Sequence, residues 1–296
     1  MAKINQHNIT EAVINHGDGG KRNPRMHEIY ASFITHMHAF VKEINLNDDE
    51  LEAARQWFSE MAKPNNDFPW GEVHLFSDLT GISELVRMMD DDANERGDAT
   101  ETNLPGPLYV PDAPLRENGA TLGDDDKGDI LYLSGRVLGE DGQPLVGATV
   151  DIWQPNSQGY YDIQDESQED YNLRGIFTTN EKGEFWTTTI NPLGYNVPLD
   201  GPCGAILHQL GRHGWRPAHI HFLINYDGYV PMTTMTYIDG AKFIDSDTVF
   251  SVKDALLKLE LHDSVDEIKE RGLDKPFYTG HFDFTLESNS QRARAA

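Results

Sequence analysis

Two histidines stand two positions apart in a segment that alternates like a β-strand, and this spacing could bind a metal. Residues 216–222 read RPAHIHF, which places His219 and His221 at alternate positions. Residues two apart on a strand point to the same face, so the two imidazoles would lie side by side. Imidazole binds iron, copper, nickel and zinc. The pair therefore predicts two ligands of one metal ion, with a hydrogen-bonded pair of core histidines as the alternative.

A second histidine pair has the same spacing in a different setting. His36 and His38 lie in a segment whose apolar residues recur at three- and four-residue steps, which is typical of a helix. Residues two apart on a helix do not face each other. We therefore expect these two side chains to lie on the surface or to pack against a helix.

Two histidines leave a coordination sphere incomplete, and tyrosines are the candidates to complete it. The single cysteine, Cys203, excludes an internal disulfide and thiolate-clustered metal sites. Tyr161 follows a predicted strand, and Tyr195 precedes the histidine pair. Tyrosine titrates near ~10, so binding as phenolate needs a strongly Lewis-acidic cation such as ferric iron. Ordinary packing with a hydrogen-bonded hydroxyl is the alternative for each tyrosine.

The elements that must position these residues fall into two parts of the chain that differ in their pattern of apolar residues. Residues 1–24 are polar, and we expect a flexible segment there. Apolar residues at helical spacing then predict helices over about 26–44, 47–61 and 72–90, the second of them with a capped start. Residues 25–105 are therefore predicted to form a helical domain.

From residue 130 on, valine, threonine and aromatic residues alternate with polar ones, and turn signals recur at short intervals. This texture predicts an antiparallel β-sandwich over 106–288, so the fold class is mainly β with a helical N-terminal part. We expect hairpins around Asp141-Gly142 and around 180–183. The remaining predictions are paired strands at 219–226 and 232–238, a helix over 250–272, a last strand near 282–286 and a loose tail over 289–296.

Composition and charge exclude several classes of partner. The chain of 296 residues has 49 acidic and 24 basic residues, a formal net charge of −25. Such a surface repels phosphate backbones and anionic lipids, so we expect neither nucleic acid nor a membrane as a partner. The start lacks the apolar stretch of a signal peptide, and no run approaches the ~18 apolar residues of a membrane span. We expect a cytoplasmic protein.

The order and spacing of residues 159–161, 194–195 and 216–222 resemble the intradiol ring-cleaving dioxygenases. The resemblance runs from about residue 26 to 287. It implies that Tyr195 leaves the metal and takes a proton when substrate binds, and that the helical domain joins two chains into a homodimer. It also implies one non-haem Fe(III) per subunit, held by Tyr161, Tyr195, His219 and His221.

The resemblance implies a reaction in which O2 cleaves an aromatic ring between two adjacent hydroxyl-bearing carbons. The product is a muconate that contains both oxygen atoms. Arg216 matches an arginine placed beside the ring carbon that gains negative charge, where a fixed guanidinium would stabilise the transition state. A structural ion pair is the alternative for Arg216.

Around residues 197–202 and 245–250 the chain looks most like hydroxyquinol 1,2-dioxygenases, whose product is 3-hydroxy-cis,cis-muconate or maleylacetate. Catechol-specific members usually carry glutamine where this chain has Met235, and catechol or a chlorocatechol is the alternative substrate. Asp78 could accept a hydrogen bond from a third substrate hydroxyl, or could be an exposed helix charge. The predicted substrate-binding residues are Leu75, Asp78, Gly106, Pro107, Leu108, Val197, Pro198 and Val249.

Residues 133–150 also resemble transthyretin-like or carboxypeptidase-regulatory sandwich modules, which bind or brace without catalysis. Such a module explains the strands, but it does not explain the two tyrosines, Arg216 and the paired histidines together. The two alternatives predict different colours, because ferric–tyrosinate charge transfer makes a dioxygenase red and a binding module would be colourless.

Overall fold

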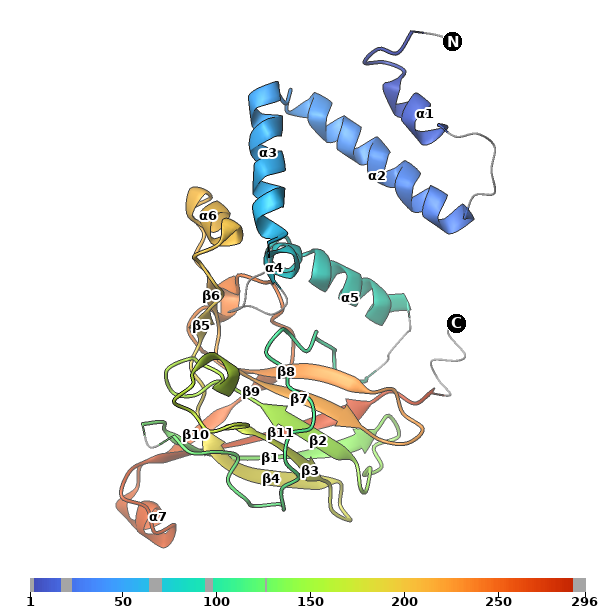
Figure 1. Cartoon of the computed structure of the whole chain (residues 1–296). Coiled ribbons are helices and arrows are strands. Elements are labelled where there is room, and N and C mark those ends of the chain that lie inside the picture. Colours follow the sequence, from blue (N-terminus) through green and yellow to red (C-terminus); the bar gives the residue numbers. More distant parts are fainter. Residues whose placement is uncertain (1–2, 17–22, 64–70, 94–97, 126, 290–296) are drawn as a thin grey trace. The chain divides into compact units, whose positions relative to one another are not determined.

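The computed structural model describes residues 3–16, 23–63, 71–93, 98–125 and 127–289. The chain divides into two compact units, Met1–Glu60 and Met61–Ala296. The described residues of the first unit form three helices, and the last of these ends on Met61, the first residue of the second unit. These helices, labelled in Figure 1, are α1 (Ile9–Ile14), α2 (Pro24–Glu43) and α3 (Asp48–Met61).

Both long helices of the first unit begin with a side-chain cap. The Asn23 side chain accepts a hydrogen bond from the backbone N–H of Met26 at the start of α2. At the start of α3, Asn47 and Glu50 each accept a hydrogen bond from the other's backbone N–H, both at 3.0 Å. This reciprocal pair is a capping box, and it confirms the start predicted for the second helix.

The histidines of α2 confirm the expectation drawn from their helical setting. His36 is exposed and its ring nitrogen donates to the Ser32 carbonyl at 2.8 Å, whereas His38 is half-buried and contacts the Thr10 hydroxyl of α1 at 3.0 Å. Helix α1 lies within the segment predicted to be flexible. Residues 1–2 and 17–22 of that segment fall outside the described residues.

The single helix predicted over 72–90 is wrong, because the structure has two helices there. These are α4 (Gly71–Leu79) and α5 (Ile82–Ala93), separated by Thr80 and Gly81. Gly81 has a φ of 73°, a left-handed conformation that glycine adopts without strain and that ends a helix. The apolar spacing continues through the break, which is why the pattern did not show it.

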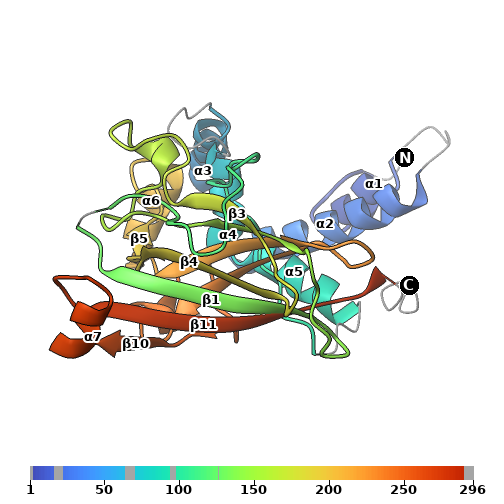
Figure 2. The same cartoon turned by 90° about the horizontal axis from the view of Figure 1, so that it is seen from below.

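Two sheets form the second unit's sandwich and confirm the predicted fold class (Figures 1 and 2). The four-stranded sheet has the order β10-β11-β1-β4 and the five-stranded sheet the order β3-β2-β7-β8-β9. The strands of the first are β1 (Ile130–Gly139), β4 (Glu184–Ile190), β10 (Leu259–His262) and β11 (Phe277–Leu286). Those of the second are β2 (Thr149–Trp153), β3 (Arg174–Thr178), β7 (His219–Asn225), β8 (Met232–Ile238) and β9 (Leu256–Leu257).

The turn at Asp141-Gly142 closes a short antiparallel bridge between Leu138 and Pro144, as the predicted hairpin requires. The predicted pairing of the longer strands is wrong, because β1 and β2 lie in different sheets, and so do β3 and β4 on either side of 180–183. Each turn therefore carries the chain across the sandwich, where the apolar faces of the two strands meet in the core. The paired strands β7 and β8 are confirmed as antiparallel neighbours.

The helix predicted over 250–272 is also wrong for most of its length, since only its last part is helical. It contains β9 and β10, and helix only in α7 (Val265–Glu270). The leucines of this stretch fit a helical spacing, but β10 pairs with β11 instead. The last strand, β11, is longer than predicted because it pairs in parallel with β1 along its whole length, as Figure 2 shows.

Alternation along β7 decides which of its residues reach the core. Ile220, Phe222 and Ile224 are buried between the sheets, where the Phe222 ring lies 4.7 Å from that of Phe284 on β11. His219 and His221 therefore point to the opposite face of the five-stranded sheet. On that face the neighbouring elements are α4, α5, the two-stranded ribbon β5 (Tyr195–Asn196) and β6 (Trp215–Arg216), and α6 (Pro202–Gln209).

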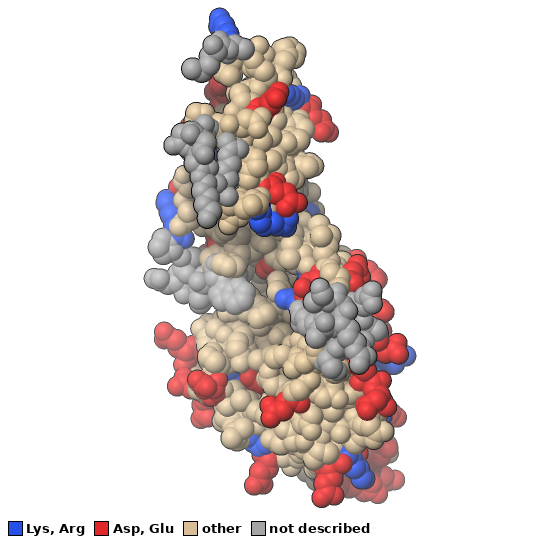
Figure 3. Space-filling view, turned by 90° about the vertical axis from the view of Figure 1, so that its right-hand side faces the viewer, with Lys and Arg blue, Asp and Glu red and all other residues tan. Residues whose placement is uncertain are grey.

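Acidic side chains are spread over the face of the molecule shown in Figure 3 and do not gather in one patch. This distribution agrees with a net charge that acts on the surface as a whole rather than at a site. None of the described helices combines the length and the apolar character that a membrane span requires.

Candidate active site

Strand β7 holds His219 and His221 side by side, as their spacing predicts. Both are buried, and their Nε2 atoms lie 3.2 Å apart. The Nδ1 atom of His219 lies 2.7 Å from the Pro217 carbonyl and must donate to it, which leaves a lone pair on Nε2. The two Nε2 atoms therefore point at one place, where a metal ion could accept both lone pairs.

Both imidazoles are held in the neutral form that binds metals. Burial, followed by the charge of Arg216, lowers the pKa of His219 to about 3. Burial and the neighbouring His219 hold the pKa of His221 well below its usual value. A neutral imidazole keeps a lone pair available for a metal at any pH near neutrality.

Two tyrosines complete this cluster, Tyr161 from the loop after β2 and Tyr195 from the short strand β5. The Tyr161 hydroxyl lies 3.1 Å from His221 Nε2, and the Tyr195 ring packs against the rings of Tyr161 at 5.8 Å and His219 at 5.5 Å. Gly159, with a φ of 86°, turns the chain after β2 so closely that an added Cβ would lie 3.2 Å from Tyr195 Cβ. The structure thus brings together all four residues that the sequence singled out.

The donor set fits a hard, strongly charged cation. Burial, followed by the proximity of Tyr195, raises the pKa of Tyr161 well above its ordinary value, so its phenolate needs a cation beside it. In the described part of the chain, no group of three or more His, Cys, Asp and Glu side chains could hold a metal ion. A metal at the histidine pair therefore needs other donors, and the two tyrosine hydroxyls are the ones present.

Arg216 on β6 is both a structural ion pair and a wall of the site. Its guanidinium is buried, lies 3.3 Å from Asp247 and donates to Tyr237 at 3.0 Å. Its Nη1 atom faces the cluster, 3.4 Å from the Tyr195 hydroxyl and 3.5 Å from His219 Nε2. Arg216 can therefore be a structural ion pair and also stabilise a transition state, because the ion pair with Asp247 holds the guanidinium next to the candidate metal centre.

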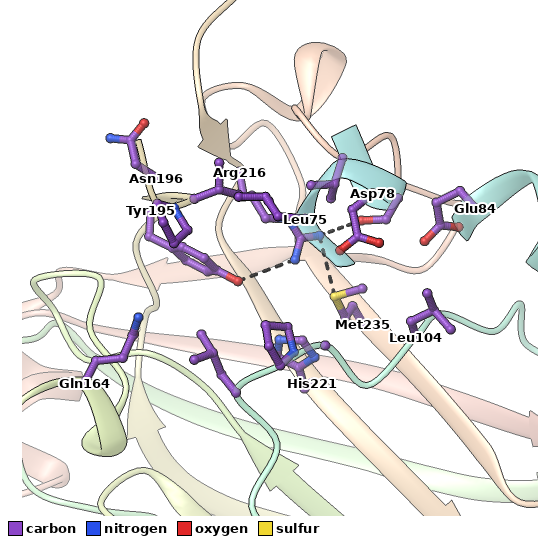
Figure 4. Close-up of a pocket in the computed structure, with 17 residues that line it drawn as sticks. Leu75, Asp78, Glu84, Leu104, Gln164, Tyr195, Asn196, Arg216, His221 and Met235 are labelled. Carbon is purple, nitrogen blue, oxygen red and sulfur yellow. Dashed lines mark hydrogen bonds between the residues drawn. The ribbon is translucent and has the colours of Figure 1, made fainter. Parts of the chain in front are cut away.

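A pocket opens beside the cluster and contains every substrate-binding residue that the resemblance implied (Figure 4). Tyr195, Arg216 and His221 form one side of it. The other predicted residues in its lining are Leu75, Asp78, Gly106, Pro107, Leu108, Val197, Pro198 and Val249. Most of these are apolar, which suits a flat aromatic ring.

The pocket also contains residues that sequence reasoning missed. Glu84 and Ser251 line it together with Leu104, Gln164 and Asn196. Glu84 is buried next to Lys253, with a carboxylate–ammonium distance of 3.5 Å. These positions lie far apart in sequence and follow no periodic pattern, so only the tertiary structure reveals them.

Asp78 and Glu84 give the pocket an acidic side, away from Tyr195 (Figure 4). Asp78 is half-buried on α4, and Glu84 is buried on α5 (Figure 4). Burial raises the pKa of both carboxyls, although Ser83 partly offsets this effect for Asp78 and Lys253 for Glu84. A ligand that fills the pocket therefore meets hydrogen-bonding carboxyl groups as well as apolar walls.

Comparisons with known proteins agree with this geometry. The family model described as "Dioxygenase" matches residues 104–288, and "Catechol dioxygenase N terminus" matches 23–98. A hydroxyquinol 1,2-dioxygenase of Rhizobium sp. (strain MTP-10005) is 39% identical over 237 residues, which are 79% of each chain.

Solved structures share the fold of this chain. Hydroxyquinol 1,2-dioxygenase from Pseudomonas putida DLL-E4 has a TM-score of 0.85 at 33% identity, covering 96% of this chain and 99% of its own. Catechol 1,2-dioxygenase from Acinetobacter radioresistens also has a TM-score of 0.85, at 28% identity, covering 98% of this chain and 95% of its own. The non-catalytic sandwich module is therefore wrong, and the chain belongs to the intradiol ring-cleavage dioxygenases, an enzyme family that depends on non-haem Fe(III).

Proposed function

We propose that this protein is a hydroxyquinol 1,2-dioxygenase that opens benzene-1,2,4-triol with O2 to 3-hydroxy-cis,cis-muconate or maleylacetate. The observation that carries the proposal is the convergence of two tyrosine hydroxyls and two imidazole Nε2 atoms at one end of an aromatic-sized pocket. Tyr161, Tyr195, His219 and His221 would hold one Fe(III) per subunit there. When bound, a ferric ion would favour the deprotonated diol and make its ring reactive toward O2.

Two residues of the chain act on the substrate directly. Tyr195, which would be a phenolate while it holds the ferric ion, takes a proton from a substrate hydroxyl as a general base and becomes the neutral phenol. Its partly exposed position on the short ribbon β5–β6 allows it to move. Arg216 presents Nη1 to the same end of the pocket and stabilises negative charge on the ring. Because the guanidinium is buried, water does not screen this charge.

The choice of hydroxyquinol over catechol rests on the acidic side of the pocket. A third ring hydroxyl is a donor, and Asp78 provides an acceptor within the lining. In the same comparison, the hydroxyquinol 1,2-dioxygenase of Rhizobium sp. is 39% identical to this chain and a catechol 1,2-dioxygenase of Acinetobacter lwoffii is 33% identical. Val197, Pro198 and Val249, with Leu75 and the 106–108 loop, hold the ring by apolar contact.

The first unit supports a homodimer. Helix α2 has no buried residue within the described chain, and it exposes large apolar side chains. Phe33 is 58% exposed and Phe40 48% exposed, which is costly unless a second surface covers them. A second copy of this chain, joined through these helices, is the partner we propose. A dimer in sedimentation equilibrium, dissociated by Phe33→Glu, is the expected result.

Oxygen uptake tests the function and the substrate in one experiment. The iron-loaded protein is mixed separately with hydroxyquinol, catechol, 3-chlorocatechol and 4-chlorocatechol. We expect a red protein whose kcat/KM for hydroxyquinol exceeds that for catechol by about tenfold or more, as a charge-assisted hydrogen bond would give. A preference for catechol would overturn the substrate, and no uptake with any diol would overturn the reaction.

A further inference from the structure

Asp247 is a buried carboxylate whose hydrogen bonds all go to the wall of the pocket. It follows the short 3-10 helix Ile244–Ser246 and is 5% exposed. Its oxygens accept from the backbone N–H of Val249 at 3.4 Å and of Ser251 at 3.1 Å, and from the Ser251 hydroxyl at 2.9 Å. Its remaining partners are two nitrogens of Arg216, Nε at 3.3 Å and Nη2 at 3.4 Å.

The pairing decides which end of the Arg216 guanidinium faces the reacting centre. Asp247 binds the Nε side of the planar fork, and Nη2 also donates to the hydroxyls of Tyr237 at 3.0 Å and Ser251 at 2.5 Å. These partners leave Nη1 directed at Tyr195 and His219. A guanidinium is rigid and planar, so fixing one edge fixes the position of the opposite nitrogen.

The pair is strongly coupled electrostatically. Burial raises the pKa of Asp247, but the charge and hydrogen bonds of Arg216 and Ser251 outweigh it, so the pKa lies below its ordinary value. The carboxylate is therefore ionised when the pocket is formed. A neutral amide of the same shape would keep the space filled but would lose the charge that orients the guanidinium.

We infer that Asp247 is a positioning residue for ring cleavage, which aims Arg216 Nη1 at the substrate without touching the substrate itself. This inference rests on the proposed role of Arg216. It differs from a purely structural role for Asp247, in which the carboxylate only holds the loop 247–251 that carries Val249 and Ser251. The two roles differ in one measurable way, because positioning requires Arg216 and loop anchoring does not.

A double-mutant cycle on the iron-loaded enzyme separates the two roles. The variants are Asp247→Asn, Arg216→Ala and their combination, each checked for iron content and for its visible absorption band. We expect Asp247→Asn to lower kcat by about 10–100-fold with a smaller change in KM, because a small displacement of a positioned group costs rate. In the Arg216→Ala background the same substitution should change kcat by less than about twofold.

A control variant and the pattern of kcat values distinguish the proposed role of Arg216 from that of Asp247. Asp283→Asn removes the carboxylate from a more exposed pair with Arg136 on the sandwich, and it should leave kcat unchanged. An Arg216→Ala variant with full activity would overturn the role of Arg216. If Arg216→Ala lowers kcat, but Asp247→Asn lowers kcat by the same factor in the wild type and in the Arg216→Ala variant, the inference about Asp247 is overturned and the role of Arg216 stands. If Asp247→Asn fails to fold, Ser251→Ala is used in its place, because it removes the hydroxyl that hydrogen-bonds to both Asp247 and Arg216. Ser251→Ala should lower kcat by a smaller factor, and it should not lower kcat in the Arg216→Ala variant.

Discussion

Trp153 and His221 are register partners on β2 and β7, and their rings stack with centroids 4.7 Å apart and an angle of 10° between planes. The indole therefore lies flat against one of the two imidazoles of the candidate metal centre. His221 Nδ1 has no hydrogen-bond partner among the described residues. Whereas the Pro217 carbonyl orients His219, packing against Trp153 orients His221.

Replacing Trp153 should therefore weaken both the fold and the metal centre. Trp153 is 1% exposed, so Trp153→Ala should lower the free energy of unfolding by about 3–5 kcal/mol and reduce the iron bound per chain. Urea unfolding and iron analysis measure the two effects. Trp186, which is 42% exposed on β4, provides the control, and Trp186→Ala should leave iron content unchanged. Full iron content in Trp153→Ala would show that the stacking does not orient His221.

The sequence predicted the histidine pair because its signal is local. Strand alternation alone places His219 and His221 on one face, and the same argument correctly separated them from His36 and His38. The two tyrosines needed the family resemblance, since nothing in their own spacing aims Tyr161 at a histidine 60 residues away.

Several failures of sequence reasoning share one physical cause. A turn at Asp141-Gly142 is a local property, but whether the next strand joins the same sheet or crosses the sandwich depends on distant partners. Glu84 and Asp247 were missed for the same reason. Each lines or supports the pocket only because a helix from one part of the chain and a loop from another meet over β7 and β8.

Tyr161 and its neighbour Tyr160 provide a matched test of the proposed ligand set. Tyr161 is buried in the cluster, whereas Tyr160 is 52% exposed. Tyr161→Phe should lower bound iron at least about tenfold and remove activity with it, because the ring stays but the oxygen donor is lost. Tyr160→Phe should change neither. Iron analysis and oxygen uptake decide the matter, and a fully active Tyr161→Phe protein would contradict the ligand assignment.

Asp78 should control substrate choice rather than the reaction itself. Asp78→Asn should lower kcat/KM for hydroxyquinol by about tenfold or more, because the hydrogen bond from the third hydroxyl loses its charged acceptor. The same substitution should change kcat/KM for catechol much less. Asp92, an exposed carboxylate on α5, provides the control, and Asp92→Asn should leave both values unchanged. Equal losses with the two substrates would mean that Asp78 does not contact the third hydroxyl.

The buried carboxyl of Asp151 should make stability depend on pH. Burial raises the pKa of Asp151 to about 6, although the Tyr109 hydroxyl and the Arg174 charge oppose the effect. A carboxyl whose pKa is raised in the folded state binds its proton more tightly there than in the unfolded state. The contribution of Asp151 to stability is therefore best below about pH 4 and falls as pH rises through about 6, by up to about 3 kcal/mol.

Asp151→Asn removes this titration while keeping an oxygen that can accept the Tyr109 hydroxyl, now 3.2 Å from Asp151. In urea unfolding at pH 4 to 8, the variant should match the wild type near pH 4 and become more stable above pH 6. Asp283→Asn should instead be less stable than the wild type throughout this range, because hydrogen bonding to Arg136 lowers the pKa of Asp283, so its stabilisation is present at pH 4 to 8 and is lost only at lower pH. A difference between Asp151→Asn and wild type that stays constant across this range would mean that Asp151 titrates normally despite its burial.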